Sequence, residues 1–170
     1  MVEQKALVER AKKKDKEAVA KLYELVYQDM YRFALYTLKN PQDAEDVVSD
    51  TVMDAYATIQ KLREASAFKS WIFRILSNKC RRKMKDYVNK TVELPEDLSG
   101  KGDFTDDVAV REAFMKLDDE ERVIISMSIF AGYSSREIGL ILQKNDNTVR
   151  SDKSRALKKM EQMLSGQGGK

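Results

Sequence analysis

Apolar residues recur every three or four positions along Asn40–Ile59, which reads NPQDAEDVVSDTVMDAYATI. This spacing predicts an amphipathic helix with one buried face. Four aspartates repeat at the same interval on a separate face of that helix: Asp43, Asp46, Asp50 and Asp54. The 170-residue chain has only two prolines and seven glycines, the residues that most often interrupt helices. We therefore expect an all-α protein in which one helix carries a row of carboxylates.

Residue types that are missing from the chain exclude several kinds of chemistry. The sequence contains no histidine and a single cysteine. This excludes acid–base catalysis by histidine, nucleophile pairs that need histidine, and the usual zinc sites. No glycine-rich phosphate-binding loop is present. We expect a protein that is not an enzyme, with no cofactor, no metal site and no small-molecule substrate.

The single cysteine, Cys80, leaves two interpretations open. Its neighbours Lys79 and Arg81 could lower the pKa of the thiol and make it redox-active. An ordinary helix position is favoured, because the sequence offers no second cysteine as a resolving partner.

Two features of the sequence bear on where the protein works. The longest nearly apolar stretch, Val123–Tyr133, is shorter than the ~20 residues that span a bilayer. The first residues, MVEQKALVERAKKKDKE, lack the apolar core of a signal peptide. We expect a cytoplasmic protein.

Charge is segregated along the chain, although the net charge is only +3. Residues 69–90 contain eight basic side chains and one acidic, residues 91–121 contain three and eleven, and residues 144–170 contain seven and three. A single basic block is often just a solvated helix face. Two such blocks on predicted helices indicate two contacts with a polyanion.

The acidic block marks a domain boundary. Helical periodicity stops between Asp86 and Asp107, where Pro95, Gly100 and Gly102 collect. We expect a first helical domain over residues 1–88, a flexible acidic linker over 89–107, a second helical domain over 108–165 and a disordered tail over 166–170.

The first domain contains two capped helices and a basic helix. Asp15 is positioned to cap a helix that runs to about Leu38, and Asn40 followed by Pro41 begins the acidic helix. After a loop over 62–67 comes the basic helix FKSWIFRILSNKCRRKMK. Aromatic residues beside cations are typical of single-stranded DNA binding, although Trp71 also fits the core. The acidic row fits either a solvated face or a docking surface for a basic helix.

The second domain has the pattern of a helix-turn-helix. Capping-box spacings begin helices at Asp118 and Ser134, and Asn145 caps the basic helix NTVRSDKSRALKKMEQML. Its apolar side is predicted to contain Val149, Ala156, Leu157, Met160 and Leu164. A short helix, a tight turn and a basic helix can place the basic helix in a DNA major groove.

Two strings in the first domain resemble region 2 of the extracytoplasmic-function sigma factors of bacterial RNA polymerase. They are LYELVYQDMYRFALYTLKNPQDAEDVVSDT and LREASAFKSWIFRILSNKCRRK. The resemblance implies that the helix with the DAED motif docks on the clamp helices of the largest polymerase subunit. It also implies that the loop and the basic helix hold the melted −10 element of the promoter. Ser49 stands where the family usually has glutamine.

The second domain resembles region 4 of the same family, at Glu137-Ile138, Thr148-Val149-Arg150-Ser151 and Arg155-Ala156. The resemblance implies that this domain reads the −35 element and lies near the β-subunit flap. The turn Gln143–Asp146 departs from the family's usual residues, and Asp152 introduces a negative charge near the expected DNA face.

The resemblance assigns three sets of site residues. The polymerase-docking set is Asp43, Asp46, Ser49 and Asp50. The −10 DNA-binding set is Leu62, Arg63, Ser66, Ala67, Phe68, Trp71, Arg74, Asn78, Lys79, Arg81 and Arg82, with the 62–67 loop and Asn78 forming a pocket for flipped bases. The −35 DNA-binding set is Ser134, Ser135, Arg136, Asn147, Thr148, Arg150, Ser151, Ser154, Arg155 and Lys158.

The function that the resemblance implies is that of an alternative sigma factor. Its expected partners are core RNA polymerase, through the clamp helices and β flap, promoter DNA at the −35 and −10 elements, and an anti-sigma factor. The alternative is a two-domain helix-turn-helix regulator that binds duplex DNA without polymerase. That alternative leaves the acidic row and the Trp71 helix without a role.

Overall fold

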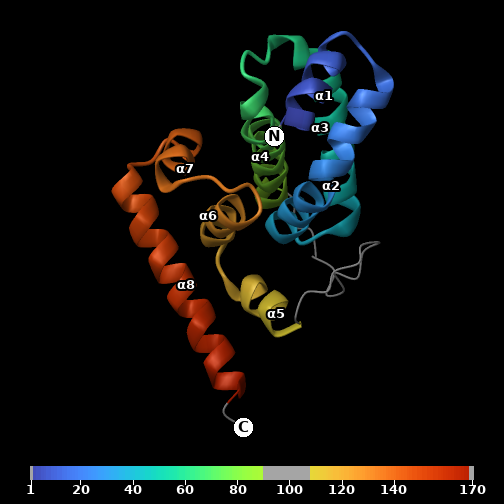
Figure 1. Ribbon diagram of the computed structural model, residues 1–170. Helices are drawn as coiled ribbons and strands as arrows, with labels where there is room; N and C mark the ends of the chain where they lie inside the picture. Colours follow the sequence, from blue (N-terminus) through green and yellow to red (C-terminus); the bar gives the residue numbers. More distant parts are fainter. Residues whose placement is uncertain (1, 90–107, 169–170) are drawn as a thin grey trace. The chain divides into compact units, whose positions relative to one another are not determined.

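The computed structural model describes residues 2–89 and 108–168, which Figure 1 colours along the sequence from blue to red. Every regular element in these two ranges is a helix. The chain divides into two compact units, Met1–Leu98 and Ser99–Lys170. The predicted all-helical architecture with two domains is therefore confirmed. The predicted linker over 89–107 lies outside the described residues, apart from Asn89 at the end of a helix.

The first unit is built around one long central helix. Its elements are α1 (Val2–Lys12), α2 (Lys16–Leu38), α3 (Pro41–Thr58), the short 3₁₀ turns η1 (Ile59–Lys61) and η2 (Ala65–Ala67), and α4 (Phe68–Asn89). α1, α3 and α4 all pack on α2. In the core, the rings of Phe33 and Phe73 meet edge to face with centroids 5.9 Å apart. The core thus fixes α4, the basic helix, against α2 and α3.

The predicted helix starts in this unit are confirmed. The Asp15 carboxylate accepts hydrogen bonds from the backbone N–H groups of Glu17 and Ala18, at 3.1 and 3.3 Å. The Asn40 side chain accepts one from Asp43 N–H at 3.1 Å. Both caps satisfy N–H groups that have no partner within the first helical turn.

The second unit is arranged along its last helix. It contains α5 (Val108–Lys116), α6 (Asp119–Ile129), α7 (Ser135–Leu142) and α8 (Asp146–Gly168), and α8 contacts the other three. Both predicted capping boxes are present, Asp118 with Glu121 and Ser134 with Glu137. Asn145 accepts a hydrogen bond from Asn147 N–H at 2.8 Å. α7, the turn and α8 form the predicted helix-turn-helix.

Several details differ from the sequence-based expectations. α1 and α5 are helices that the apolar pattern did not single out. α8 continues through Gly168, so the predicted disordered tail is helical over residues 166–168. Glycine lowers helix propensity by about 1 kcal/mol but, unlike proline, does not clash with the preceding turn. Leu157, predicted on the apolar side of α8, is 43% exposed.

Within the two described ranges, no helix is both long enough and apolar enough to cross a membrane.

Candidate nucleic-acid interface

The acidic row of α3 divides into two pairs of carboxylates with different surroundings. Asp43, whose side chain is 19% exposed, accepts a hydrogen bond from Tyr87 Oη and lies 3.6 Å from Lys83 Nζ. Asp54 lies 2.8 Å from Lys79 Nζ. The three partners all belong to α4, so these two carboxylates join α3 to α4 within the unit. Asp43, predicted as a docking residue, is therefore largely occupied inside its own domain.

The other two aspartates remain on the surface. Asp46 is exposed and accepts a hydrogen bond only from its own helix, from Gln42 Nε2 at 3.3 Å. Asp50 is exposed and forms no hydrogen bond or ion pair through its side chain with any residue that the structure describes. Asp46 and Asp50 are thus the members of the row that are open to a partner molecule.

An apolar side chain continues the same exposed face. Met53 is 70% exposed, and Asp46, Ser49, Asp50 and Met53 follow one another at steps of three, one and three residues, which places them on one side of a helix. We call these four residues the docking strip. Sequence reasoning did not select Met53, although its spacing from Asp46 and Asp50 carried the signal.

The basic helix α4 also has two sides. Lys69, Lys79 and Lys83 form ion pairs with Asp29, Asp54 and Asp43, so these lysines face the rest of the unit. Another line of residues, which we call the open face of α4, has helical spacing: Trp71, Arg74, Asn78, Arg82 and Lys85. Arg74, Asn78 and Arg82 are exposed, and their side chains bond to no other described residue.

The aromatic pair at the start of α4 is partly in the core. Phe68 is 3% exposed, whereas Trp71 is partly exposed and its ring centroid lies 6.2 Å from that of Phe68. Among the predicted aromatic contacts to bases, only Trp71 therefore reaches the surface. Lys79, committed to Asp54, and the half-buried Arg81 lie at the edges of the open face.

The 62–67 loop exposes some of its predicted residues and buries others. Arg63 and Ser66 are exposed and Ala67 is half-buried, but Leu62 is 5% exposed and packs into the core. Asn78 lies ten residues beyond Phe68 in α4, which is about 15 Å at the rise of an α-helix. The loop and Asn78 therefore cannot close on one base as a single pocket; they are placed to meet different nucleotides.

The predicted DNA face of α8 is exposed over its length. The exposed members are Asn147, Thr148, Arg150, Ser151, Ser154, Arg155 and Lys158, and Ser134 and Arg136 are exposed at the start of α7, where Ser135 is half-buried. Arg150 lies 3.5 Å from Asp146 and 3.4 Å from the Asn147 side-chain oxygen. These contacts within one helix hold the guanidinium near the N-terminus of α8.

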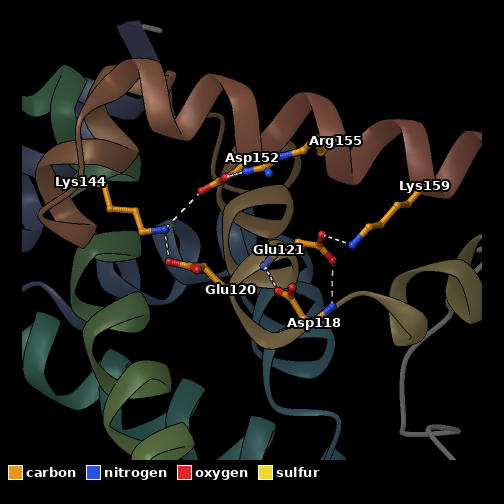
Figure 2. A network of polar contacts seen from close by, with 7 residues as sticks. All are labelled: Asp118, Glu120, Glu121, Lys144, Asp152, Arg155 and Lys159. Atoms are coloured by element: carbon orange, nitrogen blue, oxygen red, sulfur yellow. Dashed lines mark hydrogen bonds and ion pairs between the residues drawn. The ribbon is translucent and has the colours of Figure 1, made fainter.

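Asp152 is neutralised by its neighbours, as Figure 2 shows. Its side chain is 14% exposed, lies 3.3 Å from Lys144 Nζ and also pairs with Arg155. Burial opposes ionisation of Asp152, but the hydrogen bonds from Lys144 and Arg155 outweigh it and lower the pKa of the carboxyl. Lys144 also pairs with Glu120 at the start of α6. The expected negative charge on the DNA face is thus internally balanced.

Cys80 lies in the core and not at a reactive surface. The residue is 0% exposed, and burial raises the pKa of its thiol. Both observations favour the interpretation as a packing residue. In residues 2–89 and 108–168, no group of three or more histidine, cysteine, aspartate or glutamate side chains could hold a metal ion.

Comparisons with known proteins assign both units. The family model for sigma-70 region 2 matches residues 22–89, and the one for sigma-70 region 4 matches residues 107–160. RNA polymerase sigma factor SigV of Bacillus subtilis is 31% identical over 143 residues, which cover 81% of this chain and 85% of that protein. The chain belongs to the extracytoplasmic-function sigma factors. SigM of Mycobacterium tuberculosis, named as such a factor, is 27% identical over 154 residues, covering 88% of this chain and 79% of its own.

Two solved structures share the fold of this sigma factor. CnrH, in complex with the cytosolic domain of CnrY, has a TM-score of 0.66 at 20% identity, covering 96% of this chain and 98% of its own. RpoE of Bartonella quintana, in complex with the anti-sigma factor NepR, has a TM-score of 0.64 at 24% identity, covering 86% and 96%. Sigma factors are transcription initiation factors and not enzymes, in agreement with the residue types that this chain lacks.

Proposed function

We propose that this sigma factor binds core RNA polymerase through the docking strip on α3. The observation that carries the proposal is the division of the acidic row. Asp43 and Asp54 are neutralised by α4, whereas Asp46 and Asp50 remain exposed beside Met53. Two open carboxylates next to an apolar side chain suit a basic helix, because charge-assisted hydrogen bonds then surround a buried contact. In the family, the corresponding helix docks on the polymerase clamp helices.

The open face of α4 then holds the melted −10 strand. Arg74, Arg82 and Lys85 supply cations for phosphates, and Trp71 supplies a ring on which a base can stack. Asn78 offers a donor and an acceptor to a base edge. The exposed loop residues Arg63 and Ser66 meet the strand further along.

The second domain reads the −35 element as duplex. α8 enters the major groove with Asn147, Thr148, Arg150 and Ser151 at its N-terminal end. Arg155 and Lys158 follow on the same exposed helix and contact base edges or phosphates. By family resemblance, this domain lies near the polymerase β flap.

Two further expectations belong to the same function. The solved neighbours CnrH and RpoE are each bound to a regulatory protein, CnrY and the anti-sigma factor NepR, and we infer an anti-sigma partner for this chain. A factor that works with core polymerase on promoter DNA acts in the cytoplasm. A regulator that binds duplex DNA without polymerase is not favoured, because it gives the docking strip no role.

The first test reverses one charge of the docking strip. Asp50→Arg should weaken binding to core polymerase about tenfold or more, because a charge-assisted contact contributes about 1–3 kcal/mol. Glu24→Arg is the matched control, since Glu24 is exposed on α2 and its side chain bonds to no other residue in the described ranges. Affinity is measured by titration of labelled protein with core polymerase, and helical circular dichroism verifies folding. An Asp50→Arg protein that binds like wild type would overturn the assignment.

A further inference from the structure

Helix α1 lies outside the part of the chain that the family comparison covers. The region 2 match begins at residue 22, whereas α1 spans Val2–Lys12. The helix buries Leu7, Val8 and Ala11 and packs against α2, η1 and η2 (Figure 1). α1 therefore lies beside the 62–67 loop, which is expected to meet melted DNA.

Two contacts fix the end of α1 in place. Lys14, which adopts φ of 64°, donates a hydrogen bond to the Tyr56 carbonyl oxygen at 2.6 Å, and its Nζ lies 4.3 Å from the centre of the Tyr56 ring. Gln60 Nε2 donates to the Lys12 carbonyl oxygen at 3.3 Å. These bonds connect the α1–α2 junction to the end of α3 and to η1, so α1 and the loop form one preformed surface.

Between α1 and the loop there is an open cleft of about 320 Å³. Val2, Gln4 and Lys5 line it from α1, and Glu64, Ala65 and Ser66 line it from the loop. The four polar side chains form no hydrogen bond or ion pair with other residues of the described chain. The cleft thus holds unused donors and acceptors from two sides, and its volume is at the lower end of that of small-molecule sites.

The chemistry of this lining suits the edge of a nucleobase. Lys5 can only donate hydrogen bonds, the ionised Glu64 can only accept them, and Gln4 and Ser66 can do both. Glutamate accepts from an exocyclic amino group, and glutamine and lysine bond to ring nitrogens and carbonyl oxygens of bases. Thymine is the one DNA base without an exocyclic amino group, so Glu64 disfavours it.

We propose that this cleft receives one unpaired base of the −10 strand, with Gln4 and Lys5 of α1 as its second wall. The inference rests on the proposed function, in which the 62–67 loop meets the melted strand. It adds a part of the chain that neither family match covers, and it gives the cleft a preference for an amino-bearing base over thymine. Enzymes that extrude bases hold them in protein pockets by hydrogen bonds to the same edges.

The experiment uses the complete sigma factor bound to core polymerase and a forked promoter whose non-template −10 strand is single-stranded. Each −10 position is replaced in turn by an abasic site, and affinity is measured for wild type and for Gln4→Ala/Lys5→Ala. Lys13→Ala is the control for loss of charge, because Lys13 is exposed at the other end of α1 and its side chain has no partner among the described residues.

On the intact fork, the double variant should bind about fivefold or more weakly than wild type, and Lys13→Ala should not. At one −10 position the abasic site should weaken wild type but leave the double variant unchanged, because the base and the cleft then act as one interaction. At that position Glu64→Gln, which can also donate, should reduce the discrimination against thymine.

The other outcomes separate this inference from the proposed function. If abasic sites weaken binding but the double variant matches wild type at every position, the cleft does not hold a base and the proposed function stands. A double variant that remains equally weaker at every abasic position contacts phosphate instead, which also overturns the base site. A holoenzyme that is indifferent to all abasic sites removes both the proposed function and the inference.

Discussion

At the scale of single residues, the acidic row of α3 shows that identical side chains at regular spacing can have different roles. Asp43 bonds to Tyr87 and lies near Lys83, whereas Asp50 has no side-chain partner within residues 2–89 and 108–168. Tyr87 depends on this contact: burial first, and then the hydrogen bond to Asp43, raise the pKa of its phenol. Asp43 should therefore act on stability and Asp50 on binding.

Asp43→Ala should destabilise the first domain by about 1–3 kcal/mol, because it leaves Tyr87 and Lys83 without their acceptor. Asp50→Ala is the matched control and should change stability by less than about 0.5 kcal/mol, since that side chain is exposed and unbonded. Urea unfolding followed by Trp71 fluorescence measures the effect, because Trp71 is the only tryptophan and lies in this domain. Equal stability of the two variants would contradict the division of the row.

At the scale of elements, the turn between α7 and α8 is tighter than its residue types suggest. Gln143 closes α7 in the left-handed region at φ of 57°, a conformation that glycine usually supplies. Lys144 N–H then donates to the Gly139 carbonyl oxygen at 2.8 Å. A Cβ added to Gly139 would lie 2.6 Å from the Lys144 carbonyl oxygen. Glycine at 139 is thus a consequence of this particular turn.

Two substitutions in this turn should have opposite effects. Gly139→Ala should destabilise the second domain by about 1–3 kcal/mol, because the new methyl group meets backbone and not a flexible side chain. Gln143→Gly should stabilise it by up to about 1 kcal/mol, because it removes the cost of the left-handed conformation. Thermal unfolding followed by helical circular dichroism measures both. A stability of Gly139→Ala equal to that of wild type would show that the turn adopts another geometry.

At the scale of the whole molecule, the two units present cations to nucleic acid in different settings. The open face of α4 combines Arg74 and Arg82 with Trp71 and Asn78, which suits unpaired bases. The face of α8 presents Arg150 and Arg155, each restrained by a carboxylate of its own helix, which suits the fixed edges of duplex DNA. Each domain should therefore contribute to a different step of initiation.

This division of labour predicts different responses to a premelted promoter. Asn78→Ala should impair open-complex formation on duplex promoters, and a template mismatched over the −10 element should recover part of the lost activity. Arg150→Ala should instead lose about 1–3 kcal/mol of discrimination at one or two −35 positions and gain much less from the mismatch. Transcription by reconstituted holoenzyme on both templates gives the comparison. A similar response of the two variants would show that the domains do not divide the work this way.

The sequence alone determined the features that depend on residues close together in the chain. Caps at Asp15, Asn40, Asp118 and Ser134 and the apolar stripes that follow them involve residues at most a few positions apart, so periodicity and spacing identify them. The same holds for the helix-turn-helix and for the exposed DNA face of α8. α1 escaped the pattern because its buried residues are only Leu7, Val8 and Ala11 in a strongly charged segment.

Only the tertiary structure decided which of the selected side chains are available. Tyr87 reaches Asp43 across 44 positions of sequence, and Lys79 and Lys83 meet Asp54 and Asp43 because α3 and α4 pack side by side. Spacing along one helix carries no information about such partners. The burial of Leu62 and the cleft between α1 and the 62–67 loop depend in the same way on which elements meet. Helix packing, and not local pattern, therefore reduced the predicted acidic row to Asp46 and Asp50.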